Sequence, residues 1–189
     1  YTINLANLFR ESGLYQAGIR YYGNASAMIT DSTVGYKTEI LHGLSAIYYE
    51  LYLHNPASVT YLDSASALAD SAWQIAELHN ITGPKADILN IRGAIQSQRG
   101  NYKQARMQLE QSLKLHLENG NDTTLAVFIN LAYACYKLED QTNALKYANQ
   151  ALLNAVRQKN SVFEYTAIEI TGLIYLSMGD SLAAERMNK

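Results

Sequence analysis

Hydrophobic side chains recur at intervals of three and four residues along almost the whole chain. That spacing places them on one face of an α-helix, and no alternating pattern typical of a β-strand competes with it. Short glycine-containing segments interrupt the helical pattern, beginning at Gly13, Gly100 and Gly179. Glycine suits the left-handed conformation that ends a helix, and an Asn or Asp after it suits the cap of the next helix. The pattern predicts an all-α chain in which short turns join antiparallel helices.

The turns divide the chain into five predicted helical hairpins, the last of them truncated. The paired helices cover about 1–12 with 14–30, 34–54 with 58–80, 85–99 with 101–118, 122–138 with 140–158, and 161–178 with 180 onward. Ser161 and Glu164 are spaced as in a capping box, which predicts a helix start at Ser161. We expect a single continuous array over 1–189, with hairpins 1–30, 34–80, 85–118, 122–158 and 161–189. Both ends interrupt a helical pattern, so we interpret the sequence as part of a longer protein.

Small residues recur in register in the last three hairpins. Gly93, Ala132 and Gly172 lie 39 and 40 residues apart. Each is followed at offsets of 7, 9 and 12 by the same kind of set, namely Gly100, Tyr102 and Ala105, then Glu139, Gln141 and Ala144, then Gly179, Ser181 and Ala184. We expect the small residues to let the two helices of a hairpin approach closely, because larger side chains would overpack the crossing.

This register resembles the tetratricopeptide repeat, which has a small residue at position 8, Tyr at 11, Gly-x-Tyr at 15 to 17, and Ala at 20 and 27. Further matches are Ala151, Tyr175, Gly13, Tyr15 and Tyr22. The period exceeds the usual 34 residues, and position 4 is never the consensus Trp. In the second hairpin Gly43 matches position 8, but an insertion displaces the alanine-rich run 65–76. The resemblance implies antiparallel hairpins stacked into a right-handed α-solenoid.

Repeats of this length resemble the arrays of bacterial, Bacteroidetes-like sensor kinases and transcriptional regulators. The resemblance implies a non-catalytic scaffold that binds a peptide or protein on its concave face. It also implies the sensory or regulatory region of a larger bacterial signalling or transcription-regulating protein. Two alternatives stay open. One is a self-associating structural module, a homodimer formed through the tyrosine cluster at Tyr48, Tyr49 and Tyr52. The other is a small-ligand-binding sensor domain.

The resemblance also implies which residues face a partner, because the concave surface of the family comes mainly from the first helix of each hairpin. The candidate partner-binding residues are Asp87, Asn90, Ile129, Asn130, Tyr133, Tyr136, Lys137, Thr166 and Glu169. Tyrosine and asparagine supply rigid contact area and adaptable hydrogen bonds. The alternative for each residue is a solvated helix face. Family members that clamp a terminal carboxylate use Lys, Arg and Asn, and only Asn130 has a match here, so we do not predict that ligand.

Composition narrows the range of partners. Fifteen basic and 17 acidic residues give a formal charge of −2, so the chain has no general basic field for nucleic acid or anionic lipid. No uninterrupted apolar stretch reaches about 18 residues, so we expect no membrane insertion. The compartment is not determined, although low charge and many Asn, Ser, Thr and Tyr residues favour a periplasmic or envelope-exposed location over the cytoplasm.

The sequence carries no signature of catalysis. No phosphate-binding glycine loop, zinc-protease motif or nucleophile elbow occurs. The four histidines are scattered without a second ligand one turn away, so we expect no metal and no cofactor. Cys135 is predicted to be a small buried thiol, and a single cysteine excludes an internal disulfide. We therefore expect no enzyme activity.

Overall fold

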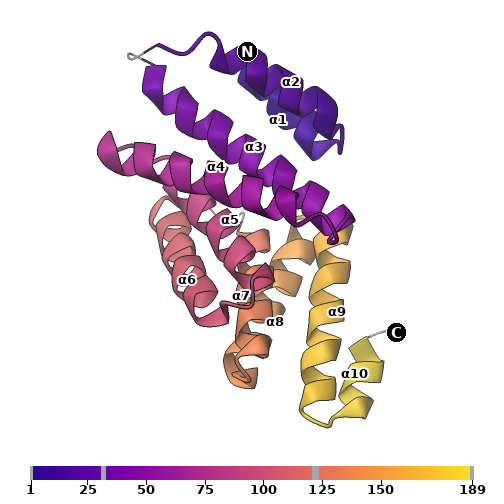
Figure 1. The fold of residues 1–189 in the computed structure, drawn as a ribbon. Coiled ribbons are helices and arrows are strands. Elements are labelled where there is room, and N and C mark those ends of the chain that lie inside the picture. Colours follow the sequence, from indigo (N-terminus) through magenta and orange to yellow (C-terminus); the bar gives the residue numbers. More distant parts are fainter. Residues whose placement is uncertain (1, 31–32, 121–123, 188–189) are drawn as a thin grey trace. The chain divides into compact units, whose positions relative to one another are not determined.

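The computed structural model describes residues 2–30, 33–120 and 124–187, and over these residues it contains helices and no strand. The helices are α1 (Thr2–Glu11), α2 (Tyr15–Ser26), α3 (Val34–His54), α4 (Val59–Leu78), α5 (Lys85–Gln98), α6 (Tyr102–Glu118), α7 (Leu125–Lys137), α8 (Gln141–Arg157), α9 (Ser161–Ser177) and α10 (Ser181–Met187) (Figure 1). The predicted all-α fold is confirmed, and the helix bounds agree with the sequence pattern to within a few residues.

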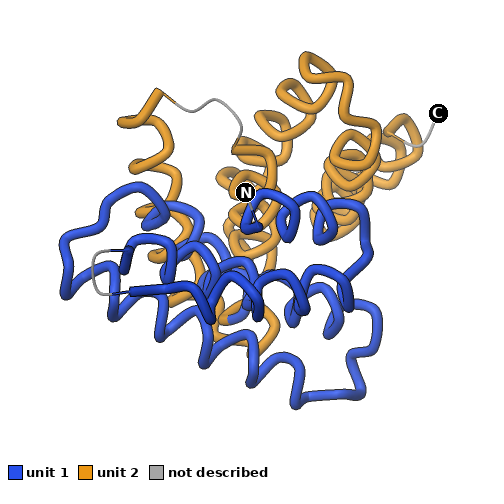
Figure 2. The backbone as a smooth tube through the Cα atoms, turned by 90° about the horizontal axis from the view of Figure 1, so that it is seen from above, with its two compact units in different colours: residues 1–95 blue, residues 96–189 orange. Residues whose placement is uncertain are grey.

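The chain divides into two compact units, residues 1–95 and residues 96–189 (Figure 2). In the first unit, α1 packs on α2 and α3 packs on α4. In the second unit, α7 packs on both α8 and α9, and α9 also packs on α10. Each unit is described by itself below, and the expectation of one continuous array over 1–189 stays a prediction.

Left-handed residues end the helices at the predicted turns. Gly13, Gly100 and Gly179 have φ angles of +73°, +79° and +79°, which glycine adopts without a steric penalty. In the fourth hairpin Glu139 takes the same place with φ +60°. A side chain bearing Cβ is strained in that conformation. The turn geometry is therefore common to these hairpins, while the residue that makes it differs.

Side-chain caps begin the last three helices. Asp140 caps α8 by accepting a hydrogen bond from the backbone N–H of Asn143 at 3.2 Å, as predicted. Asp180 likewise accepts from the backbone of α10 at 2.9 Å. The capping box predicted at Ser161 is wrong, because Asn160 is the N-cap and accepts from the backbone N–H of Phe163 at 3.3 Å. The Asn160 oxygen satisfies the donor that the serine was expected to take, and Ser161 becomes the first helical residue.

A tyrosine ring fills the notch left by a glycine in the first unit. Tyr22 is fully buried in a cluster with Ala6, Ala25, Ile40 and Ile47. Its hydroxyl hydrogen-bonds the side chain of Asn7. A Cβ at Gly43 would overlap the outer edge of the Tyr22 ring. The glycine at this position therefore allows α2 and α3 to interlock.

Gly172 was expected to serve the same purpose, and that expectation is wrong. A Cβ built on Gly172 would meet no atom of a neighbouring helix within 4 Å. The partner helix α10 has only seven residues, and no side chain corresponding to Tyr22 reaches this position. A small residue here fits the repeat pattern without being needed for a close approach.

Alanine ladders line the second helices of two hairpins. In α4 and α8 the fully buried residues are Ala65, Ala69, Ala72 and Ala76, and Ala144, Ala148, Ala151 and Ala155. Both sets follow the same four-three-four spacing and lie 79 residues apart, two repeat periods. The predicted displacement of the first run is therefore wrong, because this helix keeps the repeat register. The added length of the second hairpin lies at the joined ends of α3 and α4, the longest helices of the described residues, with 21 and 20 residues.

The aromatic residues of the second hairpin are built into the first unit. Tyr48, Tyr49 and Tyr52 are half-buried and all pack against one cluster, which contains Leu62, Ala65, Ala69, Ile91 and Ile95. Trp73 is half-buried, and the cations of Lys85 and Arg92 lie 5.7 and 5.4 Å from its ring centroid. The three tyrosines thus contribute to the packing of α3, α4 and α5 and present only part of their ring surfaces.

Candidate functional site

The predicted partner-binding residues of α7 lie on one side of that helix. Ile129, Asn130, Tyr133 and Tyr136 are half-buried, and Lys137 is exposed. The opposite side of α7 supplies Ala132 and Cys135 to a core cluster with residues of α8 and α9. The packing of α7 therefore leaves the predicted residues at the accessible edge of the core.

The structure brings three of these residues together. The ring centroids of Tyr133 and Tyr136 lie 6.5 Å apart, and the Lys137 ammonium lies 5.4 Å from each centroid. Contact between a cation and a ring face stabilises by about 0.5–1 kcal/mol at an exposed site. The lysine therefore orders two rings that would otherwise rotate in solvent.

A fourth residue, missed in the sequence, completes this group. Tyr102 of α6 packs edge-on against Tyr133, with ring centroids 6.3 Å apart and an interplanar angle of 72°. The sequence assigned Tyr102 only to packing within its hairpin. The available signal was the next repeat, which places a tyrosine on the first helix opposite the Gly-x-Tyr turn. We call Tyr102, Tyr133, Tyr136 and Lys137 the aromatic cluster.

The first helix of the last hairpin carries an exposed apolar face. Val162, Tyr165, Leu173 and Leu176 are 73%, 70%, 41% and 56% exposed. With Glu169, which is also exposed, they follow a three- and four-residue spacing and share one face of α9. We call these five residues the α9 stripe. Exposed apolar patches of this kind mark interaction surfaces in soluble proteins.

Comparison with known proteins agrees with this arrangement. Residues 85–153 match the family model described as tetratricopeptide repeat. Residues 85–153 belong to the tetratricopeptide repeat family. This segment contains all of α6 and α7 and most of α8, and it includes the whole aromatic cluster.

Solved structures show that the same kind of fold extends beyond the matched tetratricopeptide repeats. BtubC (BKLC) from P. vanneervenii is 19% identical with a TM-score of 0.73, and the match covers 97% of this chain and 74% of that one. Two structures described as a Podosopora anserina kinesin light chain with nearly identical TPR-like repeats are 14% and 13% identical. Their TM-scores are 0.62 and 0.61, and each match covers 98% of this chain and 89% of theirs. No curated protein matches the sequence.

An ion-pair network fixes the tetratricopeptide repeats next to the aromatic cluster. Arg106 of α6 donates to Glu110 at 2.8 Å and to Asp140, the N-cap of α8, at 2.8 Å. Hydrogen bonds from Asn143, and then the Arg106 guanidinium, hold the pKa of Asp140 below its ordinary value of 3.8. The network joins α6 to the start of α8 and so limits relative movement of the helices that carry the cluster.

Cys135 lies directly behind Tyr133 and Tyr136 in the tetratricopeptide repeats. It is fully buried, as predicted, and burial raises the pKa of its thiol to about 11. A thiol in this state is a packing group, because only the thiolate is a nucleophile or a metal ligand.

The remaining predicted residues lie elsewhere. Thr166 is half-buried on α9, and its hydroxyl donates to the backbone carbonyl of Val162 at 2.9 Å. Asp87 is exposed and Asn90 is half-buried, both on α5 within residues 1–95. Burial lowers the pKa of His42, and the nearby Asp87 carboxylate opposes that effect.

No helix of the described residues is both long enough and apolar enough to cross a membrane. Within the same residues, no group of three or more His, Cys, Asp or Glu side chains is arranged to hold a metal ion.

Proposed function

We propose that this chain is a non-catalytic scaffold that binds a peptide or protein through the aromatic cluster and the α9 stripe. Tetratricopeptide repeats generally mediate protein–protein interaction, and their fold is typically a non-catalytic scaffold. The carrying observation is that ordered aromatic rings on α7 and an exposed apolar face on α9 occur on two first helices that pack directly against each other. Aromatic anchors of this kind dominate the binding energy of interfaces.

The chemistry of these residues indicates the kind of segment that they bind. The contact area comes from tyrosine, leucine and valine, with a single cation at Lys137 and a single anion at Glu169. Such a surface favours a segment with two or more apolar side chains over a highly charged tail. Asp87 and Asn90 on α5 belong to the same proposal as a further polar contact region.

A peptide selected against the intact chain tests this proposal. After selection from a display library, binding is measured by fluorescence anisotropy. Tyr136→Ala and Leu176→Asp are each expected to weaken binding roughly ten-fold, because each removes an apolar anchor. The matched control is Leu153→Asp on α8, where the leucine is also exposed, and it should leave affinity unchanged. Loss of binding in the control with full binding in both test variants would contradict the proposal.

We also propose that residues 1–189 act as one repeat array. The buried stripes of α4, α6 and α8 begin at Ala65, Ala105 and Ala144, a regular spacing of 40 and 39 residues. Neighbouring repeats of such an array unfold cooperatively. Trp73, the single tryptophan, reports on residues 1–95, whereas circular dichroism reports on all helices. Coincident denaturation curves are expected, and two separate midpoints would refute a single array.

The wider context that we propose is the sensory or regulatory region of a larger bacterial signalling or transcription-regulating protein. The long repeat period and the low charge content support this context. Sequencing the native reading frame on both sides provides the test. A kinase or DNA-binding region in the same frame is the expected result. A stop codon soon after Lys189 with no anchor upstream would leave a free-standing adaptor instead.

A further inference from the structure

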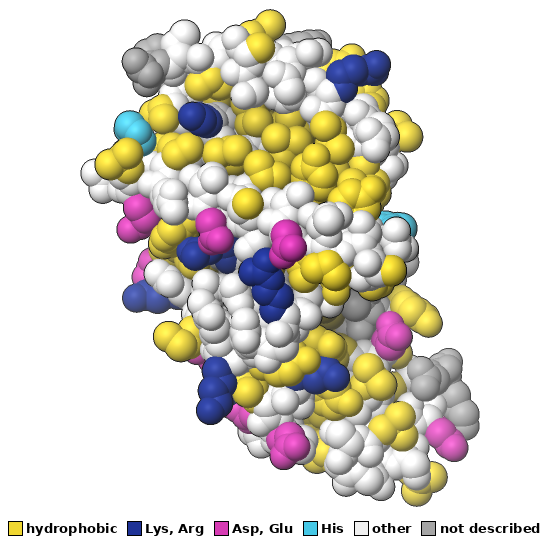
Figure 3. All heavy atoms as spheres, viewed as in Figure 1, with side chains coloured by type: hydrophobic (Ala, Val, Ile, Leu, Met, Phe, Trp, Pro, Cys, Tyr) yellow, Lys and Arg dark blue, Asp and Glu magenta, His cyan; other side chains and the backbone are white. Residues whose placement is uncertain are grey.

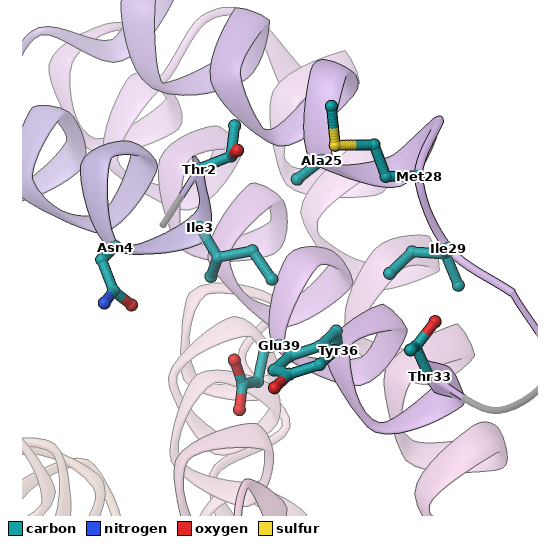
Figure 4. Close-up of a pocket in the computed structure, with 9 residues that line it drawn as sticks. All are labelled: Thr2, Ile3, Asn4, Ala25, Met28, Ile29, Thr33, Tyr36 and Glu39. Carbon is teal, nitrogen blue, oxygen red and sulfur yellow. The ribbon is translucent and has the colours of Figure 1, made fainter.

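A second possible binding site lies in the first unit, far along the sequence from the aromatic cluster. A cleft of about 410 Å³ opens between the beginning of α1, the end of α2 and the beginning of α3 (Figure 4). This volume falls within the range of about 300–1,000 Å³ that is usual for small-molecule sites. On the face shown in Figure 3, hydrophobic side chains gather over the helices of this unit.

The floor of the cleft is apolar. Ile3 of α1 and Ile29, just beyond α2, point toward each other across it, and Ala25 lies between their helices (Figure 4). Ile3 and Ile29 also pack against the core cluster around Tyr22. The floor is therefore an exposed extension of the core, and covering it removes apolar surface from water.

One wall of the cleft is anionic and aromatic. Tyr36 and Glu39 are three residues apart on α3, so their side chains lie on the same side of the helix (Figure 4). The Tyr36 side chain is 53% exposed. Glu39 is exposed and forms no ion pair with the described residues. None of the described lining residues is a lysine, arginine or histidine.

We propose that this cleft binds a small organic cation, with its apolar body on Ile3 and Ile29 and its ammonium group between the Glu39 carboxylate and the Tyr36 ring. A carboxylate attracts an ammonium group and repels an anion. A tyrosine ring face attracts a cation through its quadrupole. The threonine hydroxyls of Thr2 and Thr33 at the rim accept further hydrogen bonds from the ammonium group.

Three probes with one hydrocarbon chain separate the role of charge from that of apolar contact. The full chain, carrying ¹³C-labelled isoleucine and methionine methyl groups, is titrated with n-hexylammonium, 1-hexanol or hexanoate. Hexylammonium is expected to shift the methyl resonances of Ile3, Ile29 and Met28 first. Its affinity should exceed that of hexanol about three-fold to five-fold, the effect of a partly exposed ion pair and ring contact, and hexanoate should bind most weakly.

Two charge-neutralising variants complete the test. Glu39→Gln keeps the shape of the side chain and should reduce hexylammonium affinity to that of hexanol, while leaving hexanol affinity unchanged. Glu185→Gln on α10 makes the same charge change at another exposed site and should have no effect. Equal affinities for the three probes, or absence of shifts at the cleft methyl groups, would overturn the proposal. These readouts report on residues 2–39, so they are independent of peptide binding at α7 and α9.

Discussion

Residues 1–95 and residues 96–189 build helical hairpins of the same kind and fix them with different side chains. In the first unit a buried ring, Tyr22, sits in the notch made by Gly43. The N-terminal residues of α2, α3 and α4 make no side-chain cap. In the second unit, by contrast, α8, α9 and α10 are all capped by side chains, and Arg106 links one of those caps to α6.

The contrast shows that one repeat position can have two physical meanings. Gly43 and Gly172 both match the small-residue position of the family pattern. A Cβ at the first would strike a buried ring, whereas a Cβ at the second would enter open space. What decides the requirement is the side chain on the neighbouring helix, which the repeat position alone does not specify.

The largest expected effect comes from closing the notch. Gly43→Ala should lower the free energy of unfolding by about 1–3 kcal/mol, the usual penalty for overpacking a well-filled site. Chemical denaturation followed by Trp73 fluorescence measures it. In a double-mutant cycle, Tyr22→Leu should reduce the penalty of the alanine, because it removes the ring that the new Cβ strikes. Additive effects of the two substitutions would show that the ring and the notch are not coupled.

Removing a cap in the second unit should have the next largest effect. Asp140→Ala is expected to lower the free energy of unfolding by about 1–2 kcal/mol, because it removes an N-cap acceptor and an ion-pair partner. Asp140→Asn keeps a cap acceptor and should be milder.

The effect of Asp140→Ala should also depend on pH. The pKa of Asp140 is lowered in the folded chain, so its stabilisation is fully present above the unfolded value of about 3.9 and is lost as the pH falls through the folded value. The difference between wild type and variant should therefore be constant near neutral pH and shrink in acid. Denaturation midpoints measured across this range check the sign, and a difference that grows in acid would contradict it.

A turn in the second unit should be open to improvement. Glu139→Gly is expected to raise the free energy of unfolding by about 1 kcal/mol, since glycine relieves the left-handed strain of this residue. Thermal denaturation gives the measurement. Glu139→Ala is the control, because it removes the same side chain and keeps the strain. Equal gains in both variants would assign the effect to charge.

The smallest expected effect tests the open position directly. Gly172→Ala should raise the free energy of unfolding by about 0.5 kcal/mol, because alanine reduces the freedom of the unfolded chain and meets no neighbour here. The same substitution thus has opposite signs at Gly43 and Gly172. Destabilisation at both positions would remove the distinction between the two units.

Much of the fold follows from local pattern, and its limits are also physical. Apolar spacing and the left-handed glycines located the helices because both act within a few residues. The register of α4 was missed because the added length in α3 and α4 shifts its alanines along the sequence without changing which face they bury. Asn160 was missed as a cap because the capping-box spacing of Ser161 and Glu164 drew the start one residue onward.

The candidate site shows the same division between local and distant information. Tyr133, Tyr136 and Lys137 come from one helix, so their proximity follows from repeat position and helical spacing. Tyr102 lies on a different helix, and its contact with Tyr133 needs the packing of two repeats. The cleft of the first unit was not foreseen for the same reason, since three helix ends create it.

The buried thiol behind the aromatic cluster makes this chain convenient for site-specific labelling. At pH 7 a pKa of about 11 leaves roughly one Cys135 thiolate in 10⁴, and its full burial blocks reagents as well. A maleimide dye should therefore react with an engineered exposed cysteine, such as that of Glu185→Cys, far faster than with the native one. A partner's arrival could then be followed by fluorescence on a chain whose own cysteine stays in place and keeps packing the core.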